Sequence, residues 1–131
     1  MYAAVAPEKG EMTALLLPAT NTSMMNIFLH HVSTTFSNYF IVMQTDQAGW
    51  HKAKDLLIPE NIRLIYQPAY SPELNPVEHL WDDIREKAFY NRTFPSLDVV
   101  INTLCDQLLR LEGNSELLRS MTYFPHFRMA A

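Results

Sequence analysis

The sequence predicts an α/β fold in which helices pack on a mixed sheet. Helical periodicities alternate along the chain with short apolar runs that are typical of strands, and glycine or proline separates them. Hydrophobic residues are 48% and charged residues 18% of the 131 residues, a balance that supports a packed core in one domain. The apolar runs are far shorter than the roughly 20 residues of a membrane-spanning helix, so we expect no membrane span.

The first third of the chain alternates between strand and helix patterns. Apolar runs over residues 2–7 and 12–17 flank a turn that ends at Gly10, which indicates a β-hairpin. Apolar residues at helical spacing predict a helix over residues 23–36. The continuous apolar run over residues 39–43 is typical of a strand that is buried on both faces.

The remainder of the chain combines a strand, a long loop and several helices. We expect a short helix over residues 50–57 and a strand over residues 62–66. Three prolines exclude regular structure between residues 68 and 76. Further helices are predicted over residues 77–88, from Ser96 to Leu111 before Gly113, and over residues 115–120.

The charge balance and the cysteine content narrow the functional classes. The chain carries 10 Lys and Arg against 14 Asp and Glu, a net charge of −4, whereas stand-alone DNA-binding modules are usually basic. Affinity for DNA would therefore come from another segment, or from a local patch with bound metal. A single cysteine excludes an internal disulfide framework, and no signal-peptide pattern is visible, so we expect a cytoplasmic protein.

Two acidic residues occupy positions where α/β proteins place chemistry. Asp46 follows the predicted strand that ends near residue 43, and ligands collect outside the carboxyl ends of strands in open sheets. Glu78 lies in the first turn of the helix that follows the proline-rich loop. Each has a structural alternative, because Asp46 could be a turn residue and Glu78 could complement the helix dipole.

The residues around both acids resemble a known family. Residues 67–81 read QPAYSPELNPVEHLW. This stretch resembles the Pro-x-Tyr-Ser-Pro-x-Leu-Asn-Pro-x-Glu signature of mariner-like insertion-sequence transposases, members of the DDE transposase/integrase superfamily. Residues 46–51, DQAGWH, resemble the Asp-x-Ala-x-x-His segment of the same family. The resemblance covers roughly residues 2–112 and places the second and third family acids on Asp46 and Glu78.

The resemblance implies an RNase H-like fold and metal-dependent chemistry on DNA. Three carboxylates in such enzymes hold two divalent ions, Mg²⁺ or Mn²⁺, which favour oxygen ligands. One ion activates a water or a 3′-hydroxyl, and the other stabilises the leaving oxygen of an in-line displacement at phosphorus. The implied catalytic and metal-binding residues here are Asp46 and Glu78, and the implied partners are transposon-end and target DNA.

Three neighbouring residues are auxiliary candidates. His51 could position a phosphate or a water near Asp46, or it could simply begin a helix in a polar cleft. Tyr70 could stack on a base, although loop packing is the alternative. Asn75 is a good N-cap for the helix that carries Glu78.

The sequence departs from the family pattern near its beginning. The first family acid lies on a strand before the hairpin, whereas Tyr2 here begins what resembles the second strand. We therefore expect residues 1–131 to form a partial catalytic domain without the first strand, the first acid or the helix-turn-helix region. Glu8 and Glu11 are poor substitutes for that acid because they lie in the predicted turn region.

Three functional hypotheses follow. The first is a transposase catalytic-domain fragment for DNA strand cleavage and transfer, inactive alone. The second is a non-catalytic remnant or interaction module that assembles with a separately encoded N-terminal transposase half, or with an intact transposase as an inhibitor. A homo-oligomer is a further possible partner. The third is another metal-dependent nuclease of the same fold, against which the proline-rich motif argues.

Overall fold

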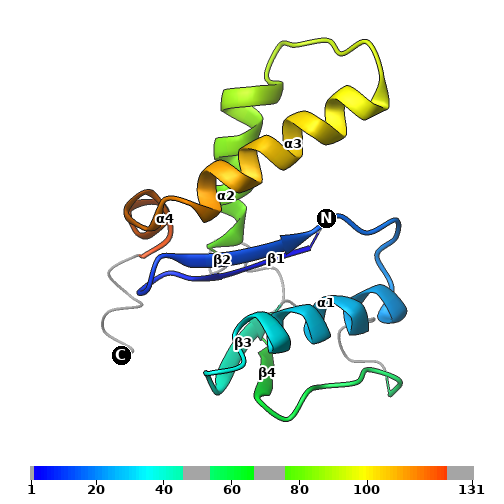
Figure 1. Cartoon of the computed structure of the whole chain (residues 1–131), viewed down its shortest axis with the longest axis vertical. Helices are drawn as coiled ribbons and strands as arrows, with labels where there is room; N and C mark the ends of the chain where they lie inside the picture. Colours follow the sequence, from blue (N-terminus) through cyan, green and yellow to red (C-terminus); the bar gives the residue numbers. More distant parts are fainter. Residues whose placement is uncertain (1, 46–53, 67–75, 124–131) are drawn as a thin grey trace. The chain divides into compact units, whose positions relative to one another are not determined.

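The computed structural model describes residues 2–45, 54–66 and 76–123. Strands and helices occur in the order β1, β2, α1, β3, β4, α2, η3, α3, α4 (Figure 1). The chain divides into a first unit, residues 1–2 and 14–75, and a second unit, residues 3–13 and 76–131. The predicted α/β class is confirmed. The described strands pair as two separate two-stranded sheets, β1–β2 and β3–β4, instead of the single mixed sheet that we predicted.

The β1–β2 hairpin forms as predicted. Strand β1 spans Tyr2–Ala6 and strand β2 spans Glu11–Leu15. Gly10 ends the turn with a φ of 65°, a left-handed conformation that favours glycine, and its N–H donates to the Ala6 carbonyl over 2.9 Å. The predicted role of Gly10 in the turn is therefore confirmed.

Helix α1 spans Thr22–Thr35 and begins at a polar cap, close to the predicted start. The Asn21 side chain accepts a hydrogen bond from the Met24 backbone N–H over 2.9 Å, which satisfies one free donor of the first turn. The buried Tyr2 hydroxyl donates to the Ala19 carbonyl and accepts from the Asn21 backbone N–H. These bonds fix the entry of the chain into α1, whose buried residues recur at helical spacing: Met25, Phe28, Leu29 and Val32.

Strands β3 and β4 form a parallel pair in the first unit. Strand β3 spans Ile41–Thr45 and β4 spans Ile62–Tyr66, with the register running from Ile41 opposite Ile62 to Thr45 opposite Tyr66. The carboxyl ends of the two strands are therefore side by side. Ligands of open α/β sheets bind outside these strand ends.

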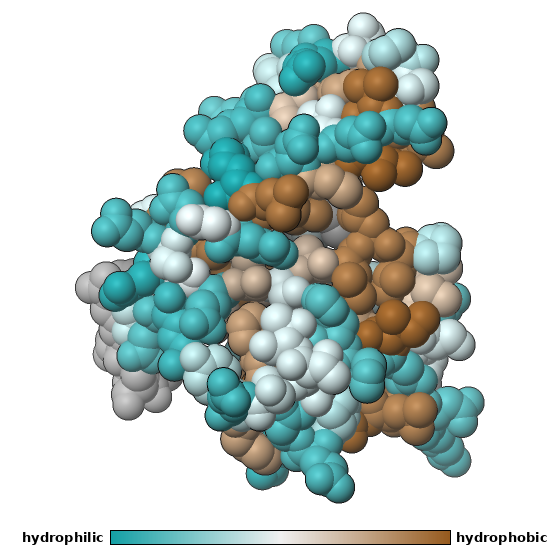
Figure 2. Space-filling model, viewed as in Figure 1, coloured by the Kyte–Doolittle hydropathy of each residue, from teal (hydrophilic) through white to brown (hydrophobic). Residues whose placement is uncertain are grey.

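The prediction that the apolar run at residues 39–43 is buried on both faces is wrong. Phe40 and Val42 are 70% and 60% exposed, whereas the alternate residues Ile41 and Met43 are half-buried. Apolar side chains lie among hydrophilic ones on the molecular surface, as Figure 2 shows. A continuous apolar run shows strand propensity, but it does not establish that the outer face of a strand is covered.

The predicted helix over residues 50–57 is wrong in the part that the structure describes. Lys54 and Asp55 form a turn and Leu57 lies in irregular chain, while residues 50–53 lie outside the described part. Asn26 of α1 holds this segment, because its amide donates to the Asp55 carbonyl over 3.2 Å and its oxygen accepts from the Leu57 N–H over 2.7 Å. Because the Asn26 side chain bonds these backbone groups, they do not need helical hydrogen bonds.

Replacing Asn26 by alanine is expected to lower the free energy of unfolding by about 1 to 2 kcal/mol, because two hydrogen bonds are lost. Urea denaturation followed by circular dichroism measures the change. Asn102→Ala is the matched control, since Asn102 is an exposed helical asparagine and the same gain in helix propensity applies to both variants. Equal effects of the two substitutions would contradict a role for the Asn26 bonds.

The second unit contains most of the helices. Helix α2 spans Val77–Ile84, η3 Arg85–Phe89, α3 Leu97–Glu112 and α4 Ser115–Thr122. The predicted start of α3 at Ser96 is confirmed, because the Ser96 hydroxyl accepts from the Val99 N–H, and α3 ends at Gly113 as predicted. In the described ranges, no helix combines the length and apolar character needed to cross a bilayer.

The helix predicted over residues 77–88 changes its winding at its second half. From Arg85 it continues as a π-helix, in which the Tyr90 N–H donates to the Arg85 carbonyl over 2.7 Å. Asn91 then takes a positive φ of 54°, and the Arg92 guanidinium donates to the Ala88 carbonyl over 3.1 Å. The regular α-helix that carries Glu78 is consequently only eight residues long.

Candidate functional site

The carboxyl ends of β3 and β4 lead into the two motif segments. Buried Thr45 ends β3 opposite Tyr66, and Asp46 is the next residue of the sequence after Thr45. Four predicted site residues lie outside the described residues: Asp46, His51, Tyr70 and Asn75. Their roles therefore remain predictions.

Glu78 lies in the first turn of α2, as predicted, and its side chain is exposed. Leu80 follows two residues later, about 200° around the helix, and is buried together with Ile84. Among the described residues, the Glu78 side chain has neither a hydrogen-bond nor an ion-pair partner. An exposed and unpaired carboxylate is a suitable oxygen ligand for a hard divalent cation.

Helix α2 begins at Val77, which is also the start of the predicted helix. Pro76 takes the N-cap position with a φ of −63° and supplies no side-chain hydrogen bond to the first turn. The predicted cap, Asn75, lies outside the described residues. The first turn is closed by the His79 N–H, which donates to the Pro76 carbonyl over 3.1 Å.

Asp82 is the acidic neighbour of Glu78 one turn further along α2. Asp82 forms an ion pair with Arg85, and both side chains are largely exposed. The mixed charges between residues 82 and 87 predict a solvated surface, and this exposed pair agrees with that prediction. Arg85 offsets the charge of Asp82, whereas no described residue pairs with the Glu78 carboxylate.

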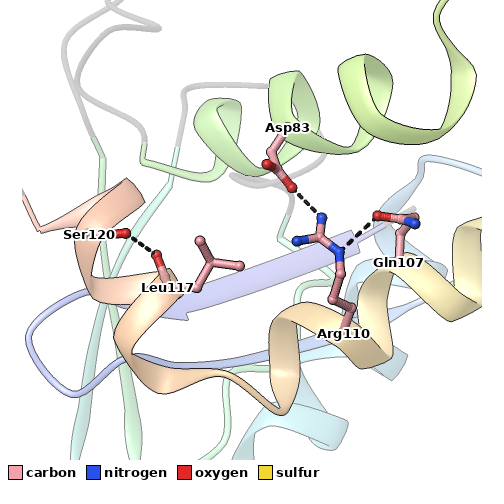
Figure 3. A network of polar contacts seen from close by, with 5 residues as sticks. All are labelled: Asp83, Gln107, Arg110, Leu117 and Ser120. Atoms are coloured by element: carbon pink, nitrogen blue, oxygen red, sulfur yellow. Dashed lines mark hydrogen bonds and ion pairs between the residues drawn. The ribbon is translucent and has the colours of Figure 1, made fainter.

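Asp83 was predicted to belong to the same exposed surface, and this prediction is wrong. Its side chain is only 14% exposed and forms an ion pair with Arg110 of α3, which is 32% exposed (Figure 3). The Arg110 Nε also donates to the Gln107 side chain over 3.0 Å. Local sequence patterns could not reveal this contact, since the partners lie on helices separated by the residue 90–96 connection.

The described ranges contain one of the two predicted metal ligands. In residues 2–45, 54–66 and 76–123, no group of three or more His, Cys, Asp or Glu side chains is arranged to hold a metal ion. Of the two predicted metal ligands, the structure describes Glu78 and leaves Asp46 outside. The donor chemistry of Glu78 fits a divalent ion, and its pairing with Asp46 stays a prediction.

Comparisons with known proteins identify the class to which this fold and these motifs belong. The model of the family described as DDE superfamily endonuclease matches residues 1–101. An uncharacterized protein of Sinorhizobium fredii, y4pE/y4sA, is 37% identical over 106 residues, which are 80% of this chain and 78% of the relative. No solved structure matches the chain.

The chain belongs to the DDE superfamily endonucleases. This confirms the resemblance that the motifs around Asp46 and Glu78 indicate. The small sheets and flanking helices of the structure agree with the RNase H-like fold of the family.

Proposed function

We propose that this chain is the catalytic-domain segment of a transposase, which acts in metal-dependent cleavage and transfer of DNA strands. The observation that carries the proposal is the exposed carboxylate of Glu78 at the start of α2, which no described residue pairs with. It stands at the end of a long proline-rich motif in a chain of the DDE endonuclease family. Family membership alone supports DNA cleavage, and the motif supports the narrower assignment to transposition.

Asp46 and Glu78 are the proposed metal ligands, each through carboxylate oxygens. Bound Mg²⁺ or Mn²⁺ would supply the Lewis acidity that activates a nucleophilic oxygen and stabilises the leaving oxygen at phosphorus. His51 would position a phosphate or a water beside Asp46, and Tyr70 would contact a base. The chain is acidic, with a net charge of −4, so bound cations would also reduce its repulsion of the DNA backbone.

The family pattern requires a third carboxylate, which it places on a strand before the hairpin. We infer that residues 1–131 by themselves hold metal weakly and that turnover needs this acid from a further transposase segment. The purified chain is therefore expected to leave transposon-end DNA uncleaved in Mn²⁺, as measured on labelled duplexes. Cleavage by the chain alone would contradict this requirement.

The ligand assignment is tested by calorimetric titration of Mn²⁺ into the wild-type chain, Asp46→Asn and Glu78→Gln. Both variants are expected to bind about tenfold or more weakly, because even outer-sphere partners of metals contribute that much. Glu116→Gln is the matched control, since Glu116 occupies the same exposed first-turn position of α4, another eight-residue helix. It should bind Mn²⁺ like the wild type.

Two results would overturn the metal-site proposal. One is a folded wild-type chain that binds no Mn²⁺, and the other is binding that neither Asp46→Asn nor Glu78→Gln changes. Either result would favour the non-catalytic alternative, in which the chain functions through contacts with another transposase chain.

A further inference from the structure

The partly buried ion pair between α2 and α3 has a geometry that restrains its guanidinium in two directions. Arg110 donates through one terminal nitrogen to Asp83 of α2 and through Nε to Gln107, one turn earlier on its own helix (Figure 3). A planar guanidinium engaged on two sides has a defined orientation, unlike a lysine ammonium. Arg110 therefore connects α3 to α2, the helix that carries Glu78.

Helix α2 is short, so its rotation depends on tertiary contacts. It is eight residues long, has at its N-cap position Pro76, which supplies no capping hydrogen bond, and changes into the π-helix at Arg85. Helices of this length are not stable by themselves and depend on tertiary contacts. The buried residues Leu80 and Ile84 supply apolar contact, which is not directional, whereas the Asp83–Arg110 pair is directional.

Asp83 lies five residues after Glu78, about 7.5 Å along the axis of a regular helix. Both residues belong to the same rigid stretch of α-helix, since the π-helix starts only at Arg85. Any rotation of α2 that broke the Asp83–Arg110 pair would therefore also turn the Glu78 carboxylate. Metal ligands need to be held closely in place by the groups behind them.

We propose that Arg110, acting through Asp83, is a positioning residue that sets the direction of the Glu78 carboxylate for binding a divalent cation. This inference rests on the proposed function, because it takes Glu78 to be a metal ligand. A purely structural ion pair would affect the stability of the second unit and leave the cation affinity of the folded chain unchanged. A positioning role changes that affinity.

The test measures Mn²⁺ affinity of the full chain from the electron paramagnetic resonance of free Mn²⁺, at a temperature where circular dichroism shows each variant folded. Arg110→Gln is expected to weaken binding about three- to tenfold, and Arg110→Lys, which keeps the charge without the planar fork, by a smaller factor. The sign is diagnostic. Removing a positive charge by itself favours cation binding, so a loss of affinity cannot be a simple charge effect.

Arg85→Gln is the matched control, because it also removes one arginine charge and one acid–arginine pair next to α2. The Arg85–Asp82 pair is exposed and spans a single turn, so it does not tie α2 to another helix. Mn²⁺ affinity should stay within about twofold of the wild type in this variant. If Arg110→Gln is not folded, the comparison of Arg110→Lys with Arg85→Gln decides.

Each outcome separates this inference from the function on which it rests. The positioning role is overturned if the Arg110 variants keep the wild-type Mn²⁺ affinity, or if Arg110→Gln and Arg85→Gln lose equal affinity. A loss of affinity in Glu78→Gln would still support the metal site in that case. Affinity that does not respond to Glu78→Gln overturns the metal site, and the positioning role with it.

Discussion

Gly10→Ala is expected to lower the free energy of unfolding by about 2 to 5 kcal/mol. A residue with a side chain pays about 1 to 2 kcal/mol for the left-handed conformation that Gly10 adopts at a φ of 65°. The new Cβ would also lie 2.2 Å from the Ser115 carbonyl oxygen, a contact that forces the start of α4 to move. Overpacking of this kind typically adds about 1 to 3 kcal/mol.

Gly113, the glycine at the end of α3, supplies the control for Gly10. Gly113 has an ordinary negative φ of −83°, and a Cβ there would lie 3.3 Å from the Leu109 carbonyl oxygen. Gly113→Ala should therefore change stability by less than about 1 kcal/mol. Urea denaturation of both variants measures the difference, and equal effects would contradict the close approach of the hairpin turn to α4.

Gly10→Asn separates the two causes of the expected loss. Asparagine tolerates the left-handed region better than alanine, but it carries the same Cβ. The variant should recover part of the stability lost in Gly10→Ala and still fall below the wild type, because the contact with Ser115 remains. Full recovery would assign the whole effect to the backbone conformation.

Leu80→Ala is expected to destabilise the chain by about 2 to 5 kcal/mol, because it leaves a cavity beneath α2. The Leu80 side chain is 0% exposed and belongs to the core of the second unit with Leu111 and Leu118. Its loss should also weaken Mn²⁺ binding if Glu78 is a ligand, since Leu80 lies two residues further along the same short helix. Thermal and urea unfolding of the purified variant measure the stability change.

Leu109→Ala is the control for Leu80, because both substitutions remove the same atoms from a helix of the second unit. Leu109 is 66% exposed, so its truncation should change stability by less than about 0.5 kcal/mol. A comparable loss in both variants would show that α2 is not packed through Leu80 as described.

The elements that the sequence predicts well depend on local chemistry. Helix α3 starts at Ser96 and ends at Gly113 because a side-chain cap and a glycine decide these positions within a few residues. The hairpin follows likewise from the conformational freedom of Gly10. The sequence does not predict the π-helix at Arg85, because it continues a regular helical pattern there.

The candidate site divides in the same way. The motifs around Asp46 and Glu78 indicate the DDE endonuclease family from the sequence alone, because each surrounds an acidic residue with a specific succession of residues. The sequence also determines that Glu78 stands in the first turn of a helix, since the preceding prolines exclude any earlier start.

Only the tertiary structure decided which of the charged residues that follow Glu78 are exposed. Asp82 and Asp83 are adjacent and chemically identical, yet Asp82 pairs with its neighbour Arg85 in solvent while Asp83 meets Arg110 from a different helix. The exposure of the outer face of β3 was also decided by the tertiary structure, because an apolar run in the sequence cannot specify what packs against it. Local patterns encode caps, turns and motifs, whereas contacts between distant segments depend on how the helices pack. That packing places Arg110 against α2, the helix that carries Glu78.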